Sequence, residues 1–149
     1  MRPLFLMLIV ALISTPLFGQ VDAVQQTEEM EKIDYYVCKA VEATDNDSCW
    51  LAASYIIDSL VYGLPPEDNT WEETHFDDVD HIFEHCGVYI EICFAETRLK
   101  MHLMINNLME AKIALDQAGY LMKANGIEIP ARFNEYKKQL ISKALEPTY

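Results

Sequence analysis

The sequence predicts an all-α protein, a helical bundle of four or five helices with one long core helix and two disulfides. Apolar residues recur at alternating intervals of three and four between residues 83 and 122, turn-forming residues separate the other apolar segments, and four cysteines follow an apolar leader. The 149 residues contain no internal repeat, low-complexity tract or linker, so we expect a single helical domain over residues 24–149.

Residues 1–23 are predicted to form a secretory signal peptide. Arg2 gives a basic start, residues 4–13 are an unbroken apolar run, and the small residues Gly19 and Ala23 are candidate cleavage positions. The apolar run is shorter than the ~20 residues that a membrane-spanning helix needs. We therefore expect an exported protein, periplasmic or secreted, with no membrane attachment after signal removal. A retained N-terminal anchor is the alternative.

The cysteines agree with export. Cys38, Cys49, Cys86 and Cys93 all follow the leader, and an even number in a short exported domain predicts two disulfides. We favour bridges from the region of the first two cysteines to the region of the last two, and the pairing stays open. Zinc binding is the alternative, but the sequence lacks the close C-x-x-C pairs that such sites use.

The mature chain is expected to open with two helices. The first covers residues 27–44, with Thr27 as its cap and glutamates in its first turn, where the helix dipole favours them. A turn at residues 45–48 leads to the second, residues 49–62, which is apolar nearly all round and so belongs in the middle of the bundle. Asp58 is its one charge, and if buried it must be hydrogen-bonded or neutral.

Residues 88–125 are predicted to be one long core helix. Glu96 lies on its polar side and can pair with Lys100 four residues later. At ~1.5 Å per residue such a helix would run roughly 50 Å, so we expect a kink near Gly87 or Gly119. The apolar stripe consists of Phe83, Gly87, Ile90, Phe94, Thr97, Met101, Met104, Leu108, Ala111, Leu115, Ala118 and Met122.

A last helix is expected over residues 130–145. Asn125 and Gly126 end the long helix, and Pro130 suits the first turn of the next one. The apolar side of this last helix carries Phe133, Tyr136, Leu140, Ile141 and Leu145.

Charge is unevenly distributed along the chain. Residues 21–86 carry seventeen Asp and Glu against two Lys, whereas residues 87–149 carry seven acids against eight Lys and Arg. Such a chain repels nucleic acid and anionic membranes and attracts a basic partner. Simple solubility of an exported protein explains the same composition.

The acidic stretch at residues 67–84 is the predicted binding surface. It has eight acids and no Lys or Arg, and a helix is expected to begin within it at Phe76. Trp71 and Phe76 lie within this stretch, and aromatic anchors ringed by charge suit an interface with a basic protein. Both aromatic side chains could instead pack under the bundle. Homodimer formation also stays open. The predicted partner-binding residues are Glu67, Asp68, Trp71, Glu72, Glu73, Phe76, Asp77, Asp78 and Asp80.

A metal- or small-ligand-binding bundle is the alternative function. Asp77, His81 and His85 are spaced four residues apart, so one helix face could present them to a metal. Met101 and Met104 could suggest copper(I), but their place in the apolar stripe favours a role in the core. No cofactor is predicted.

Enzyme signatures are missing from the sequence, including G-x-S-x-G, H-E-x-x-H and glycine-rich phosphate loops. The cysteines, if bridged, cannot act as nucleophiles. We therefore lean against catalysis, and a small exported enzyme of unknown type is the third reading.

One resemblance sharpens the binding prediction. Cys38 and Cys49 are separated by ten residues and are followed on the second helix by Ala53-Ser54-Tyr55-Ile56. This pattern resembles the opening of the small helical periplasmic immunity proteins that neutralise type VI secretion effectors such as cell-wall amidases. The resemblance covers the first two helices only. It implies an exported, disulfide-bonded helical protein that blocks a toxin by binding at its active site.

Overall fold

The computed structural model describes residues 23–62 and 70–146, and within these ranges it contains helices and no strand. The all-α prediction is therefore confirmed. The predicted signal peptide lies outside the described residues, apart from Ala23. The helices are α2 (Ala23–Asp45), α3 (Cys49–Tyr62), α4 (Thr70–Met104), α5 (Leu108–Ala124) and α6 (Ala131–Leu145).

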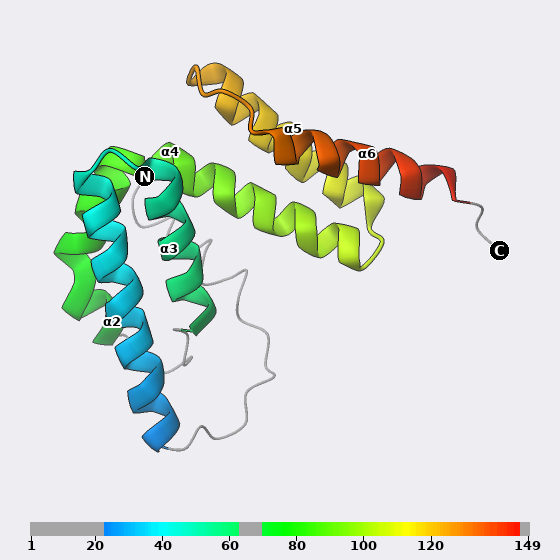
Figure 1. The fold of residues 1–149 in the computed structure, drawn as a ribbon. Coiled ribbons are helices and arrows are strands. Elements are labelled where there is room, and N and C mark those ends of the chain that lie inside the picture. The colour runs from blue at the N-terminus through cyan, green and yellow to red at the C-terminus, as the bar shows by residue number, and fades with distance from the viewer. Residues whose placement is uncertain (1–22, 63–69, 147–149) are drawn as a thin grey trace.

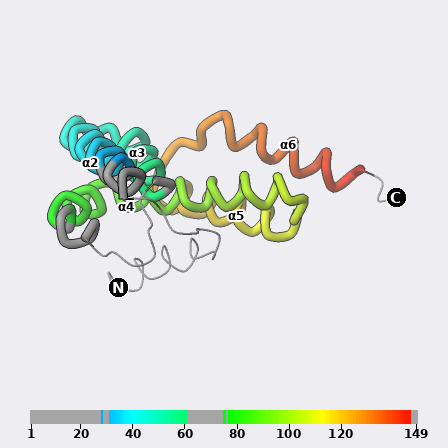
Figure 2. The backbone as a smooth tube through the Cα atoms, turned by 90° about the horizontal axis from the view of Figure 1, so that it is seen from below, coloured from blue at the N-terminus to red at the C-terminus, as the bar shows by residue number. Residues whose placement is uncertain are grey.

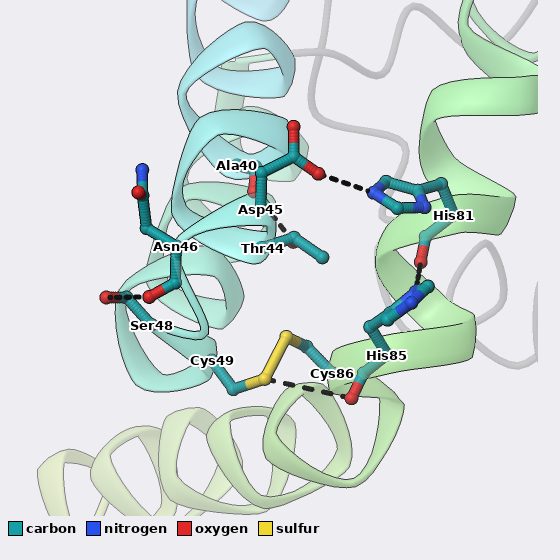
Figure 3. Close-up of a disulfide and its surroundings, with 9 residues drawn as sticks. All are labelled: Ala40, Thr44, Asp45, Asn46, Ser48, Cys49, His81, His85 and Cys86. Atoms are coloured by element: carbon teal, nitrogen blue, oxygen red, sulfur yellow. Dashed lines mark hydrogen bonds and ion pairs between the residues drawn. A yellow bond between two sulfur atoms is a disulfide. The ribbon is translucent and has the colours of Figure 1, made fainter.

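The described helices form two lobes that share α4 (Figures 1 and 2). The first half of α4 packs with α2 and α3, and its second half packs with α5, which in turn carries α6. We call α2, α3 and residues 70–86 the N-terminal lobe, and residues 87–146 the C-terminal lobe. Figure 3 shows that α4 changes direction just beyond Cys86. Gly87 follows at once, and glycine is a common residue at helix bends.

The two halves of α4 bury different faces. Both sets of buried residues have helical spacing, but Ile90, the last of one set, and Ile92, the first of the other, are two positions apart, a rotation of roughly 200° around the axis. One helix can therefore serve two cores that lie on opposite sides of it. The first set is Val79, Ile82, Cys86 and Ile90; the second is Ile92, Ala95, Leu99 and Leu103.

This change of face corrects the predicted apolar stripe. Met101 and Met104, expected in the core, are 56% and 84% exposed, whereas Glu96, expected on the polar side, is only 6% exposed. A single stripe through residue 94 extends the buried face of the first half of α4 into the second half, which buries a different face. The prediction that these methionines fill the core is wrong.

The predicted long helix is also divided into two helices. α4 ends at Met104 and α5 begins at Leu108, so the chain reverses between them. Asn106 has φ 60°, a left-handed conformation that ends a helix, and the Asn107 side chain accepts a hydrogen bond from the backbone N–H of Glu110. The expected break near Gly119 does not occur, because α5 runs through that residue.

Most other helix limits follow local signals. α3 has the predicted bounds, and Gly126 adopts φ 65° after α5, as its position in the sequence indicates. α2 begins before Thr27, so Thr27 is not its cap, and α4 begins at Thr70 rather than at Phe76. α3 contacts both α2 and α4, but Leu51 is 49% exposed, so this helix is not enclosed on all sides.

Candidate protein-binding surface

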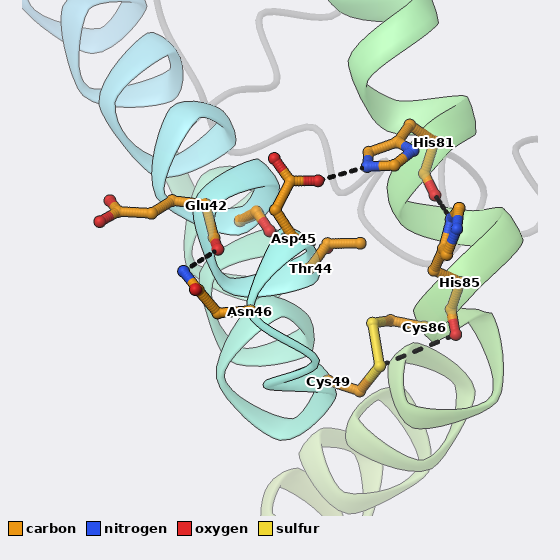
Figure 4. Close-up of polar contacts among 9 residues, drawn as sticks. Glu42, Thr44, Asp45, Asn46, Cys49, His81, His85 and Cys86 are labelled. Carbon is orange, nitrogen blue, oxygen red and sulfur yellow. Dashed lines mark hydrogen bonds and ion pairs between the residues drawn. A yellow bond between two sulfur atoms is a disulfide. The ribbon is translucent and has the colours of Figure 1, made fainter.

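Two histidine–carboxylate contacts hold α2 beside the first half of α4. His75 Nε2 on α4 contacts Asp34 Oδ1 on α2, and His81 Nε2 contacts Asp45 Oδ1 at 2.9 Å (Figure 4). The two aspartates are eleven residues apart, close to three helical turns, so they lie on the same side of α2. These contacts align the two helices along a shared line, which we call the α2–α4 seam.

The seam is lined by exposed carboxylates. Asp34 and Asp45 stay exposed despite their contacts with histidine, and the exposed Asp78 on α4 has its Oδ2 3.9 Å from His75 Nδ1. Asp77, one helical turn before His81 on α4, is also exposed. Asp80 is half-buried. The fold therefore adds two acids of α2 to the acids predicted on α4. Sequence reasoning missed Asp34 and Asp45 as members of this surface, because only the packing of α2 on α4 brings them there.

Part of the predicted surface cannot be placed. Glu67 and Asp68 lie outside the described residues. The structure gives the backbone of α4 at four further predicted positions, but their side chains also lie outside what is described. These four are Trp71, Glu72, Glu73 and Phe76. The aromatic anchors thus remain a prediction from the sequence.

The predicted metal ligands make other contacts. The His81 and His85 rings lie 4.6 Å apart between centroids, and His85 Nδ1 lies 2.9 Å from the backbone oxygen of His81. His81 also contacts Asp45, as described above. Among the described residues, no group of three or more His, Cys, Asp or Glu is arranged to hold a metal ion.

One disulfide joins the start of α3 to the bend of α4. Cys49 and Cys86 are bonded, with Cα atoms 5.1 Å apart (Figure 3), and Cys49 Sγ lies 3.7 Å from the carbonyl oxygen of His85. This bridge joins the two regions predicted from the sequence, that of the first two cysteines and that of the last two. It closes a loop of 37 residues, which in the chain-entropy treatment stabilises the fold by about 4 kcal/mol.

The prediction of two disulfides is wrong, because Cys38 and Cys93 are free. Cys38 is exposed on α2 and Cys93 is half-buried on α4. Burial and the nearby Glu96 carboxylate raise the pKa of the Cys93 thiol to about 11. That thiol is therefore protonated at neutral pH, which makes it a poor nucleophile.

A polar cluster around the buried Glu96 in the C-terminal lobe was not predicted. Glu96 on α4 accepts hydrogen bonds from Arg132 Nε at 2.8 Å and from Tyr136 Oη at 2.7 Å, both on α6. The Arg132 guanidinium also lies 4.9 Å from the centre of the Trp50 ring on α3. This cluster, which we call the Glu96 cluster, connects α6 to both lobes.

Arg132 and Tyr136 together donate three hydrogen bonds to the Glu96 carboxylate. Burial raises the pKa of Tyr136 to about 12, and its hydrogen bond to Glu96 acts in the same direction, so the hydroxyl stays protonated and donating. Lys100 Nζ adds a cation 3.6 Å from the carboxylate. A buried carboxylate that accepts hydrogen bonds from its neighbours suits a structural role. The sequence showed only the Glu96–Lys100 spacing, because Arg132 and Tyr136 lie far along the chain.

The class that fold and surface define is an acidic two-lobed α-helical protein. In the described part of the chain, no helix combines the length and apolar character needed to cross a membrane. No protein-family model, curated protein or solved structure matches the chain.

Proposed function

We propose that this chain is an exported helical protein that acts by binding a basic protein through its N-terminal lobe. The supporting observation is that the bend of α4 falls at the boundary of the charge pattern. Residues 21–86 carry seventeen acids and two lysines, and the described part of them folds into one lobe. One of these lysines, Lys39, is already paired with Glu42.

The physical basis is electrostatic attraction between surfaces of opposite charge. Carboxylates on the α2–α4 seam belong to two different helices, so they form a surface rather than a single row. Such a surface raises the rate of encounter with a basic partner and repels acidic ones. Charges at this surface act over the Debye length, about 8 Å at physiological salt, so the complex should weaken as salt rises.

The sharper form of the proposal is an inhibitor or immunity protein. It rests on the resemblance of the first two helices to periplasmic immunity proteins. The apolar leader and the Cys49–Cys86 bridge support export, since disulfides persist in oxidising compartments. In this form the captured partner is an enzyme whose activity is lost when it binds the chain.

Affinity capture from extracts of the producing cell tests the proposal. We expect the immobilised chain to retain a basic protein at low salt and to release it as salt rises towards roughly 0.5 M. The double reversal Asp77→Lys and Asp78→Lys should abolish capture, and Trp71→Ala should weaken it.

The matched control is the double reversal Glu128→Lys and Glu146→Lys. It makes the same change of net charge on exposed acids of the C-terminal lobe. Capture should survive in this control. Equal loss in both double variants would show that only net charge matters, and unchanged capture by the Asp77 and Asp78 variant would refute the proposed surface.

A further inference from the structure

The outward face of α5 carries an apolar stripe. Met109, Ile113 and Tyr120 are 73%, 53% and 72% exposed. Their spacing of four and then seven residues places them on one side of the helix. That side is opposite the buried face of α5, which consists of Ala111, Ala114, Ala118 and Met122.

A helix on the surface of a small protein normally has polar residues on its outer side. α5 instead carries three large exposed apolar side chains on its outer side, with the polar Asp116 and Gln117 between Ile113 and Tyr120, in addition to its apolar inner side. Its inner side is already occupied, because α4 and α6 pack against α5. The outer side therefore presents a second surface with the spacing that helices use to pack against other helices.

We propose that this stripe is the contact surface for a second copy of the chain, with the two α5 helices antiparallel about a twofold axis. The charge distribution favours this occupant. Residues 87–149 carry seven acids and eight Lys and Arg, so two C-terminal lobes meet with little repulsion. Contact between two N-terminal lobes would bring together two strongly acidic surfaces. Pairing through α5 keeps those surfaces apart.

The sequence of α5 also favours the antiparallel direction. If Met109 of one copy lies beside Tyr120 of the other, Ile113 lies near the twofold axis. Lys112 and Asp116 lie on the same flank of the stripe and pair with each other within one chain. In an antiparallel pair, Lys112 of each copy also faces Asp116 of the other copy. Opposite charges flanking an apolar contact fix its direction and register.

The dimer is independent of the proposed function. If both hold, one assembly displays two acidic surfaces pointing away from each other, so a partner with two binding sites would gain from avidity.

Sedimentation equilibrium tests the dimer. The sample is the protein as processed at its N-terminus by the producing cell, and intact-mass spectrometry defines that terminus. We expect twice the mass of one chain at micromolar concentration. Ile113→Asp should raise the dissociation constant at least about a hundredfold, because the carboxylate would be buried in both copies. Met104→Asp is the matched control, since Met104 is also apolar and exposed in the C-terminal lobe but lies outside the stripe. It should leave the mass unchanged.

A charge exchange tests the direction. Lys112→Asp should weaken association about tenfold, because the two symmetry-related contacts with Asp116 of the other copy then bring like charges together. Adding Asp116→Lys restores the opposite charges and should restore the dimer, and the recovery shows that the single variant had folded. A chain that stays monomeric at about 200 µM overturns the proposal, as does a dimer indifferent to Ile113→Asp. Failure of the double variant to recover overturns the antiparallel arrangement.

Discussion

Glu96 and Arg132 are 36 residues apart in the sequence, and they form a two-point ion pair between α4 and α6. Arg132 Nε lies 2.8 Å from one carboxylate oxygen, and its terminal nitrogen lies 3.1 Å from the other. The same guanidinium covers the Trp50 ring of α3. The two lobes are connected covalently by the backbone of α4. This arginine adds a direct side-chain contact between α6 and the N-terminal lobe.

Removing the arginine should destabilise the fold. Arg132→Met leaves Glu96 buried with fewer donors, and we expect a loss of about 2 kcal/mol, less than for a fully buried pair because Arg132 is partly exposed. Urea unfolding followed by circular dichroism measures it. Lys138→Met removes an exposed ion pair with Glu135 on the same helix and should change stability by less than about 0.5 kcal/mol. Equal effects in the two variants would contradict a structural role for the Glu96 cluster.

Stability should fall in acid partly through Glu96. Burial acts to raise its pKa, but hydrogen bonds from Arg132 and Tyr136 outweigh burial and leave the pKa below the ordinary 4.5. A carboxyl with a lowered pKa in the folded state stabilises fully above its unfolded pKa and loses this contribution as pH falls through the folded value. We expect the stability difference between the natural chain and Glu96→Gln to be constant near neutrality and to shrink below about pH 4.5. A difference that persists undiminished in strong acid would be inconsistent with the lowered pKa.

The thiols should react in two classes. With no reductant, the unfolded chain should show two reactive thiols. In the folded chain at pH 8, Cys38 should react quickly, and Cys93 slowly because it is half-buried and its pKa is about 11. Cys38→Ser and Cys93→Ser assign the two phases. If the unfolded chain showed no free thiols, Cys38 and Cys93 would instead form the second disulfide expected from the sequence.

The turn between α4 and α5 should depend on one asparagine. Asn106 has φ 60°, which asparagine and glycine tolerate better than other residues. Asn106→Ala should therefore cost about 1 kcal/mol in urea unfolding, whereas Asn106→Gly should cost little. Asn134→Ala is a suitable control, because this exposed asparagine lies inside α6. A stabilising effect of Asn106→Ala would indicate that the two helices tend to fuse.

Local signals predicted the helix limits well where one residue type decides the backbone. Gly126 ends α5 in a left-handed conformation that glycine adopts without strain, and Pro130 precedes α6. At residues 105–107 neither glycine nor proline is present, so the break was missed. Two adjacent asparagines were the available signal, and their effect depends on whether packing elsewhere favours a reversal.

The candidate surface was predicted in part. The acids of α4 were visible as a run in the sequence, and Asp77 and Asp78 are exposed as a binding surface requires. The contribution of Asp34 and Asp45 was not visible, because it depends on how α2 packs beside α4. The pairing of Cys49 with Cys86 was likewise one of several that the spacing allowed.

From its sequence alone, this protein is specified as helical, strongly acidic before residue 87 and nearly neutral after it, because helical spacing and side-chain charge are properties of short stretches. Tertiary structure alone decided that α4 buries one face in each lobe, that Glu96 is buried against Arg132, and that Met109, Ile113 and Tyr120 face outward. These outcomes depend on contacts between residues far apart along the chain, and a periodic pattern does not specify which of two apolar faces a distant helix will cover.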